Sequence, residues 1–243
     1  MGPMGLMRLR LGPHQIASEK PIDVTKRSPT RSTASMKLLI LGATGATGLE
    51  VVAQAVERGH TVTAFVRNAD PLGKFGDRIN IVRGDLLDGV ELGRVLAGQE
   101  AVLSAFGPRL PTSRADADLL QRFAAVLTGA MKRTDVRRAV IESTAFLFKD
   151  AILPPAHRFG RLFFPGIVRD ATEMENTVAQ SGLDWTLVRP PQLTNKPFTG
   201  RYRARIGQLP TFGFKISRAD VADFMIKAGE NHASIQKIIG IAN

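Results

Sequence analysis

Apolar residues recur along this chain in two patterns, and from Met36 onward the two patterns alternate. Short apolar, β-branched runs are typical of buried parallel strands. Apolar positions three and four residues apart are typical of helices that pack through one face. Strands are predicted over 37–41, 60–66, 79–83, 101–105, 138–142, 184–189 and 235–239, and helices over 49–56, 90–96, roughly 114–133, near 169–181 and from Ser217 onward.

Alternating strands and helices predict an α/β fold of the Rossmann type, a doubly wound, mostly parallel sheet with helices on both faces. In such sheets ligands bind beyond the carboxyl ends of the strands, where the strand order reverses. The last helix opens with Ser217 and Asp220, which have the spacing of a capping box. The first helix is expected to pack through one apolar face, made of Leu49, Val52, Ala53 and Val56.

The turn between the first strand and the first helix contains three glycines, Gly42, Gly45 and Gly48. In this context one glycine allows the tight turn, one lets the backbone approach a pyrophosphate, and one lets the helix pack close to the strand. The free N–H groups and the positive end of the helix dipole favour phosphate charge. The turn therefore predicts a dinucleotide site, whose candidate residues are Gly42, Thr44, Gly45, Ala46, Thr47 and Gly48.

Arg67 follows the second predicted strand, 19 residues after Gly48. An acidic side chain about 20 residues beyond the glycines would bind the ribose 2′-hydroxyl of NAD. A planar guanidinium instead suits the 2′-phosphate of NADP. NADPH is therefore the expected cofactor, and the alternative for Arg67 is a solvent-facing side chain at a strand end.

Further cofactor-binding candidates follow the third and fourth strands. Asp85 and Leu86 are placed to contact an adenine ring, through a carboxylate and an apolar side chain respectively. The alternative for Asp85 is the cap of a turn or helix. Ser104 and Gly107 follow the fourth strand, where small residues would let the backbone come near the cofactor.

Thr144 and Gln192 are the catalytic candidates, because they follow the fifth and sixth strands at the edge where nicotinamide chemistry is expected. Neither side chain titrates near neutral pH. Common short-chain reductases use a Tyr-x-x-x-Lys pair, in which lysine lowers the pKa of the tyrosine so that it passes a proton. The only tyrosine here is Tyr202, with Ile206 four residues later, so that pair is excluded.

The composition narrows the remaining classes of function. The chain has no cysteine, which removes disulfides, thiolate catalysis and zinc–thiolate sites and suits a reducing, cytoplasmic location. Its four histidines are scattered, so no metal site is expected. No apolar stretch reaches about 18 residues, so neither a transmembrane helix nor a membrane partner is expected.

The formal net charge is +11, of which +4 belongs to residues 1–35 and +7 to the remainder. A basic surface can attract nucleic acid. No aromatic platform, zinc finger or basic helix accompanies the charge in the sequence. Solvated arginines and an anionic cofactor account for it, so no nucleic-acid partner is expected.

Residues 1–35 contain prolines, serines and threonines without sustained periodicity, and they cannot bury enough apolar surface to offset their ordering entropy. A disordered tail or a misassigned start is expected, because Met36 stands directly before the first strand. A transit peptide is the alternative. Residues 36–243 are assigned to one NAD(P)-binding domain that includes a small C-terminal substrate region.

Several segments, taken together and in order, resemble the atypical short-chain dehydrogenase/reductases of the NAD(P)H-binding, NmrA-like family. The likeness spans roughly residues 36–243 and is greatest to the biliverdin-IX-beta reductase/flavin reductase group. In that group a serine corresponds to Thr144 and a histidine to Gln192, so the hydroxyl is retained here and the imidazole is not. The segments are Gly42 to Gly48, Val66-Arg67, Gly84-Asp85, Ser143-Thr144-Ala145-Phe146-Leu147, Ser181-Gly182-Leu183, Arg189-Pro190-Pro191 and Pro197-Phe198-Thr199-Gly200.

The resemblance implies an NADPH-dependent oxidoreductase that transfers hydride to a small planar acceptor of the flavin, quinone or tetrapyrrole class, with flavin favoured. Residues 151–168 interleave apolar side chains with prolines and arginines, which suits a lid over the acceptor, a plain hydrophobic loop or a subunit contact. The alternative function is a non-catalytic NADP(H)-binding redox sensor of the NmrA type, which the missing Tyr-x-x-x-Lys pair and histidine favour. The oligomeric state is left open.

Overall fold

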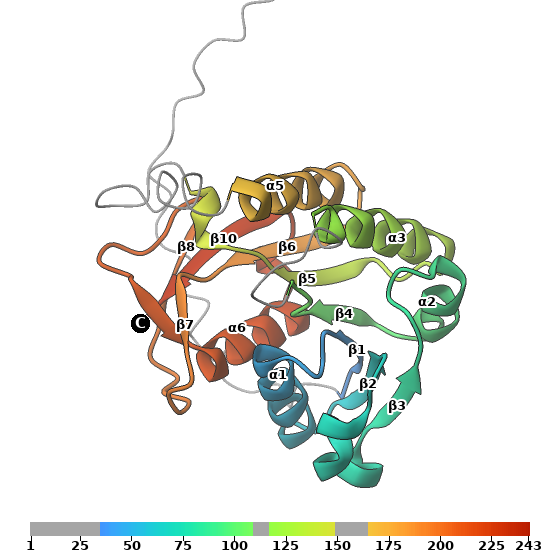
Figure 1. Ribbon diagram of the computed structural model, residues 1–243. Coiled ribbons are helices and arrows are strands. Elements are labelled where there is room, and N and C mark those ends of the chain that lie inside the picture. Colours follow the sequence, from blue (N-terminus) through green and yellow to red (C-terminus); the bar gives the residue numbers. More distant parts are fainter. Residues whose placement is uncertain (1–34, 109–116, 149–164) are drawn as a thin grey trace, which may run out of the picture.

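The computed structural model describes residues 35–108, 117–148 and 165–243. Within them an eight-stranded sheet has the order β3-β2-β1-β4-β5-β6-β10-β8 (Figure 1). β8 is antiparallel to β10, and the other neighbouring strands are parallel. The strands are β1 (Lys37–Leu41), β2 (Thr61–Val66), β3 (Asn80–Arg83), β4 (Ala101–Ser104), β5 (Arg138–Glu142), β6 (Asp184–Arg189), β8 (Arg203–Ile206) and β10 (Lys237–Ala242).

Helices cover both faces of the sheet, which confirms the predicted Rossmann-type architecture (Figure 1). α1 (Ala46–Glu57) and α6 (Arg218–Glu230) pack on one face, and α2 (Gly89–Leu96), α3 (Leu119–Arg133) and α5 (Pro165–Ala179) on the other. The strand order reverses between β1 and β4, so the carboxyl ends of these strands form the crevice in which ligands of such sheets bind. The described residues also contain the 3₁₀ segments η1 (Asp70–Arg78), η3 (Ala145–Leu147) and η4 (His232–Ser234).

The core consists of two apolar layers, one on each face of the sheet. Alternate residues of β1 enter different layers, because successive side chains of a strand point to opposite faces. Leu38 and Ile40 pack with α1 and α6, and Leu39 and Leu41 pack with α2, α3 and α5. A strand buried on both faces is apolar throughout, which is why its sequence shows no polar alternation.

The predicted packing face of α1 is confirmed in part, since Val52 is fully buried and the other three residues pack against the core. Val51, Val52 and Ala55 are fully buried, whereas Leu49, Ala53 and Val56 are only partly buried. The face that meets the sheet passes through Gly48, because this glycine lies directly against the preceding turn. Close backbone contact at Gly48 therefore turns the most deeply buried side of the helix toward Val51 and Ala55.

The C-terminal region adds strands that short polar sequences did not predict. β7 (Gln192–Thr194) pairs in parallel with β9 (Lys215–Ser217), outside the main sheet. Ser217 caps α6 as predicted, accepting a hydrogen bond from the Asp220 N–H (3.0 Å). The reciprocal half of the capping box is not formed, because the Asp220 carboxylate accepts the backbone N–H groups of Thr199 (3.0 Å) and Gly200 (2.9 Å) instead.

Two predicted segments fall outside the described residues. One is the N-terminal tail up to residue 34, and the other is the lid expected over 151–168, apart from its last four residues at the start of α5. The predicted helix over 114–133 is observed as α3 from Leu119. Within the described residues, no helix is both long and apolar enough to cross a bilayer.

Candidate functional site

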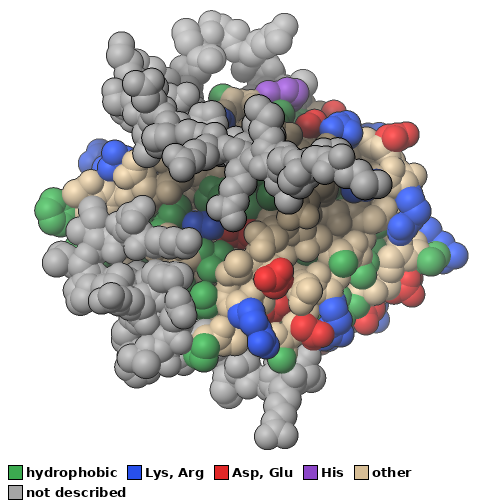
Figure 2. Space-filling model, turned by 90° about the horizontal axis from the view of Figure 1, so that it is seen from above, with side chains coloured by type: hydrophobic (Ala, Val, Ile, Leu, Met, Phe, Trp, Pro, Cys, Tyr) green, Lys and Arg blue, Asp and Glu red, His purple; other side chains and the backbone are tan. Residues whose placement is uncertain are grey.

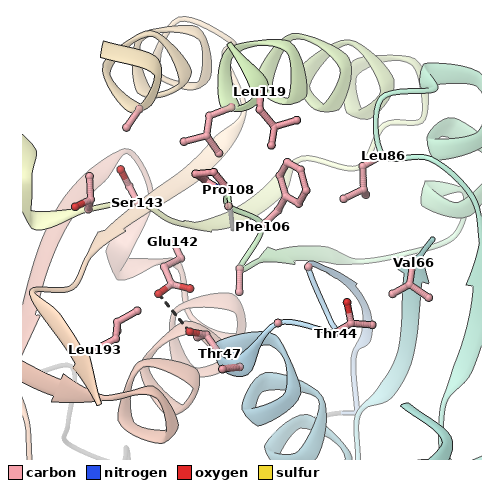
Figure 3. A pocket seen from close by; sticks show the side chains of 18 of the residues that line it. Thr44, Thr47, Val66, Leu86, Phe106, Pro108, Leu119, Glu142, Ser143 and Leu193 are labelled. Carbon is pink, nitrogen blue, oxygen red and sulfur yellow. Dashed lines mark hydrogen bonds between the residues drawn. The ribbon is translucent and has the colours of Figure 1, made fainter. Parts of the chain in front are cut away.

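A cavity of about 1020 Å³ lies at the carboxyl edge of the sheet, across the reversal of strand order. Side chains and backbone following β1, β2, β3, β4 and β5 line it, together with residues from β7, α3, α5 and the start of α6. Figure 3 shows Thr44 and Thr47 on one side, Leu86, Phe106 and Leu119 on another, and Glu142 pointing toward Thr47. The volume lies at the upper end of the range for ligand pockets, which suits a ligand as large as a dinucleotide.

The glycine turn after β1 is built by backbone contacts that leave no room for side chains. Gly42 has φ +73°, and a Cβ there would lie 2.6 Å from the carbonyl oxygen of Ala105. A Cβ on Gly48 would lie 2.1 Å from the carbonyl oxygen of Gly42. Gly45 donates its N–H to the same carbonyl (2.9 Å). Gly42 therefore makes the turn and Gly48 brings α1 against it, as their spacing predicts.

The start of α1 is open, unlike the starts of the other helices that can be compared in the described residues. Its N-cap is Gly45, with no side-chain hydrogen bond and no acidic residue in the first turn. Asp88 caps α2, Ser217 caps α6, and Asp170 accepts the N–H groups of Leu120 and Gln121 (both 2.9 Å) at α3. The first amides of α1 face the cavity without a protein acceptor, so they can bind an anion there.

Arg67 lines the same cavity at the end of β2, next to Asn68. The side chain is exposed, and no ion-pair or hydrogen-bond partner for it is present among the described residues. A guanidinium without an internal partner can bind an external phosphate bidentately. Arg67 and the glycine turn line the same cavity, so the contact of Arg67 with a 2′-phosphate stays a prediction.

After β3, Leu86 lines the cavity and Asp85 does not. The Asp85 carboxylate accepts the N–H of Leu87 (3.0 Å), and the Asp85 N–H donates to Glu91 Oε2 (2.9 Å). This geometry is the turn cap that the sequence left open as the alternative. Leu86 lines the cavity on the same side as Phe106 (Figure 3), so this side offers an apolar surface for a flat ring.

After β4, Gly107 lines the cavity and Ser104 does not. Ser104 is fully buried as the last residue of the strand, and its hydroxyl accepts the N–H of Phe106 at 3.4 Å. A Cβ on Gly107 would meet nothing within 4 Å, so the fold itself does not require glycine there.

After β5, Ser143 and Thr144 both line the cavity. The Thr144 hydroxyl accepts the N–H of Phe146 (3.3 Å) and caps η3. The Ser143 hydroxyl donates to Glu175 Oε1 (2.5 Å), and Glu175 also forms a two-pronged ion pair with Arg189 (3.0 and 2.5 Å). This buried network links the turn after β5 to α5 and β6. Because it engages the Ser143 hydroxyl, Thr144 remains the hydroxyl available for the predicted catalytic role.

Gln192 is not brought to the cavity, and its neighbour Leu193 is. Gln192 is exposed at the start of β7, where its N–H donates to the carbonyl oxygen of Phe214 (3.3 Å). Adjacent residues of a strand point to opposite sides, so the register of β7 against β9 sends Leu193 inward and Gln192 outward. The sequence did not predict β7, and so it could not predict this register.

Glu142 is an ionisable cavity residue that sequence reasoning missed. It ends β5, and its Oε1 accepts a hydrogen bond from Thr47 Oγ1 at 3.5 Å (Figure 3). Burial raises the pKa of Glu142 to about 7, against the opposing effects of the Thr47 hydrogen bond and the positive charge of Arg218. A carboxyl group at the end of an apolar parallel strand was the only sequence signal that could have indicated it.

The residues present fit a dinucleotide. The glycine turn and the open end of α1 suit a pyrophosphate, Arg67 suits a further phosphate, and Leu86 and Phe106 suit a flat ring. Among the described residues no three potential metal ligands gather. On the face shown in Figure 2, the basic side chains of the described residues are interspersed with acidic ones and form no continuous patch.

Sequence comparison relates this chain to a known family and to other proteins. A family model described as NAD(P)H-binding matches residues 42–232, which is most of the chain. An uncharacterised chloroplastic protein of Arabidopsis thaliana is 30% identical over 229 residues, covering 90% of this chain and 81% of that protein. A (4-alkanoyl-5-oxo-2,5-dihydrofuran-3-yl)methyl phosphate reductase of Streptomyces griseus is 31% identical over 153 residues, covering 63% of this chain and 46% of that reductase.

Solved structures have the same fold. A Rossmann-fold NAD(P)-binding family protein from Shigella flexneri is 26% identical, with a TM-score of 0.66 over 86% of this chain and 94% of that one. The anaerobillin reductase ChuY from Escherichia coli O157:H7 is 20% identical, with a TM-score of 0.69 over 84% of this chain and 96% of that one. At that identity the second likeness concerns the fold alone.

Proposed function

This chain belongs to the NAD(P)H-binding family, and we propose that it is an NADPH-dependent reductase that transfers hydride to a flavin or a similar planar conjugated acceptor. One observation carries the proposal: a single cavity joins the open start of α1 and Arg67 to the polar residues that follow β5. The Streptomyces griseus relative is a reductase by name, which supports the same class of reaction.

The residues of the cavity indicate which part would bind the cofactor and which part the acceptor. The turn from Gly42 to Gly48 holds the phosphates, and Leu86 and Phe106 flank the ring end of the nucleotide. When bound, NADPH supplies the hydride, so the protein has to orient two ligands and keep water from competing. Ser143 and Thr144 lie at the opposite end, and Leu193 and Ile167 supply apolar surface for a flat acceptor.

Arg67→Ala should weaken NADPH binding about tenfold to a hundredfold, because one charge-assisted contact worth about 1.5–3 kcal/mol is lost. The affinity for NADH should hardly change, since NADH has no 2′-phosphate. Isothermal titration with both nucleotides measures the two affinities. Arg83→Ala is the matched control: Arg83 ends the neighbouring strand β3, is exposed and does not line the cavity. Equal losses for NADPH and NADH would contradict the assignment of Arg67 to the 2′-phosphate.

Thr144→Val should lower turnover about tenfold with little change in NADPH affinity, because one orienting hydrogen bond is removed while the side-chain volume is kept. Steady-state kinetics and the melting temperature separate this effect from damage to η3, which Thr144 caps. Thr177→Val on α5 removes a comparable hydroxyl away from the cavity and should leave turnover unchanged. Unchanged kinetics in Thr144→Val would place the acceptor elsewhere.

The reductase proposal is tested with NADPH and a panel of acceptors: FMN, FAD, riboflavin, quinones and biliverdin. Loss of NADPH absorbance that requires both protein and acceptor supports the proposal, and the acceptor with the highest kcat/KM names the class. Tight NADPH binding without oxidation by any acceptor would refute it and favour the redox-sensor alternative. That alternative rests on the absence of a Tyr-x-x-x-Lys pair from the chain.

A further inference from the structure

The cavity has very few groups that can exchange a proton. Among its described lining residues the ionisable side chains are Arg67, Glu142 and Arg218. Arginine does not release a proton near neutral pH, and the hydroxyls of serine and threonine do not either. Tyr202, the tyrosine of the chain, is buried elsewhere and donates its hydroxyl to Asp223 Oδ2 (2.5 Å). Glu142 is therefore the carboxyl group of this cavity and its sole candidate acid within the described residues.

The structure holds Glu142 in a fixed position between two parts of the cavity. It ends β5, where it pairs with Val188 of β6, and the preceding Ile141 pairs with Ser104 of β4, so the strand holds its backbone in place. Its carboxyl group lies between the start of α1, through Thr47, and the Ser143–Thr144 turn (Figure 3). It thus stands between the phosphate-binding turn and the residues proposed to face the acceptor.

Few charged side chains lie around Glu142, and most of them already have a hydrogen-bond or ion-pair partner. Arg218, at the start of α6, acts on it electrostatically, but the Arg218 guanidinium is hydrogen-bonded to Asn195 Oδ1 (2.6 Å). Behind Ser143, Arg189 is paired with Glu175. Arg67, the other charged side chain of the cavity, lies at the end of β2, with β1 and β4 between β2 and β5. No ion pair to Glu142 is found in the described part of the chain, so no paired cationic side chain cancels the effect of burial on the pKa of Glu142.

We propose that Glu142 is the proton donor of the reductive step, a role that rests on the proposed reductase function. The acceptor gains a hydride from the nicotinamide cofactor and a proton from a carboxyl oxygen of Glu142. It is thereby reduced by two electrons, NADPH becomes NADP⁺, and Glu142 is left as a carboxylate that water reprotonates. Glu142 takes the part that tyrosine has in the common short-chain reductases.

Protonation of Glu142 near neutral pH is consistent with its surroundings. Because burial raises the pKa of Glu142 to about 7, about half of the molecules carry the proton at that pH. The protonated fraction falls as the pH rises through this value. Reduction should therefore be fastest on the acidic side and decline above about pH 7.

The test compares wild type with Glu142→Gln, which keeps the shape and removes the proton. With an acceptor that the panel identifies, Glu142→Gln should lower kcat about a hundredfold and lose the decline of kcat above neutral pH. Glu142→Asp, which retains a shorter acid, should keep the decline and regain part of the rate. Glu173→Gln, an exposed glutamate on α5 away from the cavity, is the matched control and should behave as wild type.

A second readout does not depend on turnover. Infrared difference spectra of the cofactor-free protein, recorded across a pH series, should show a carboxylic acid band that titrates near pH 7 in wild type and is missing in Glu142→Gln. NADPH affinity, followed by nucleotide fluorescence, should differ less than about threefold between the two, so that a slower kcat is not a loss of cofactor.

The outcomes separate the two proposals. If wild type reduces an acceptor and Glu142→Gln matches it in rate and pH profile, the donor role is overturned and the reductase function stands. If the infrared spectra show that the Glu142 carboxyl group is already ionised well below neutral pH, the donor role is also overturned. If wild type binds NADPH and reduces no acceptor, the reductase function fails and the donor role fails with it.

Discussion

Replacing Gly48 with alanine should reduce NADPH affinity by at least about a hundredfold. A Cβ at this position would lie 2.1 Å from the carbonyl oxygen of Gly42, 2.8 Å from its carbonyl carbon and 2.9 Å from the Cα of Ala43. All three are backbone atoms, so no side chain can rotate away to make room. The start of α1 has to move away from the turn, and its amides move with it.

The size of this effect follows from the geometry of hydrogen bonds. N–H···O bonds weaken steeply outside a donor–acceptor range of about 2.7–3.2 Å, so a displacement of about an ångström breaks them. Losing two charge-assisted bonds of about 1.5–3 kcal/mol each exceeds a hundredfold in affinity. Overpacking should also cost about 1–3 kcal/mol of stability, which thermal unfolding measures.

Gly93→Ala on α2 is the matched control for Gly48→Ala. Both glycines are helical, but a Cβ on Gly93 would meet nothing within 4 Å. Alanine is the better helix former by about 1 kcal/mol, so Gly93→Ala should be neutral or stabilising and should bind NADPH like wild type. If Gly48→Ala binds NADPH as tightly as Gly93→Ala does, the start of α1 is not the phosphate site.

Arg138→Met should lower the free energy of unfolding by about 3–5 kcal/mol, because a buried network of hydrogen bonds loses its central donor. Arg138 starts β5 and is 6% exposed. Its guanidinium donates to the carbonyl oxygens of Asp184 (2.5 Å) and Ala228 (2.5 Å) and to Ser234 Oγ (3.0 Å). These acceptors belong to β6, α6 and η4, so one side chain joins three elements at the end of β5 opposite the cavity.

The charge of Arg138 survives its burial. Burial lowers the pKa of Arg138 to about 10, and the nearby Asp184 carboxylate opposes that change, so the guanidinium remains protonated at neutral pH.

Arg137→Met is the matched control: the neighbouring arginine is exposed and contacts the Gly182 carbonyl (2.7 Å) and, more loosely, Asp184 (3.6 Å). Exposed pairs of this kind contribute about 1 kcal/mol or less. Urea unfolding of the two variants at equal concentration measures the difference, and equal midpoints would show that the network does not stabilise the fold.

Local patterns in the sequence were sufficient for the order of the elements and for the glycine turn. The turn from Gly42 to Gly48 depends on backbone conformation and close approach within seven consecutive residues, and glycine is the residue that permits both. Arg67 could be placed at the sheet edge because it directly follows a strand, and strands of a parallel sheet end at the same edge. Ser217 could be identified as a cap for the same local reason.

Register and long-range packing decided the rest of the site. Leu193 enters the cavity in place of Gln192 because of how β7 pairs with β9, more than 20 residues away in the chain. The contact of Gly48 with Gly42 sets the rotation of α1, so Val51 and Ala55 are buried more deeply than the predicted Leu49, Ala53 and Val56. The pairing of a strand decides on which face of the sheet each side chain lies, and a shift of the register by one residue moves every side chain to the other face.

The sequence by itself thus determined the Rossmann-type fold, the glycine turn and the place of Arg67 at the sheet edge, since these depend on residues close together in the chain. Only the tertiary structure decided which polar side chains are buried and what they meet. Glu142 meets Thr47, 95 residues away, and Arg138 meets Ser234, 96 residues away. Desolvation and hydrogen bonding set the protonation and the energetic weight of such groups, and both arise only when distant segments pack together.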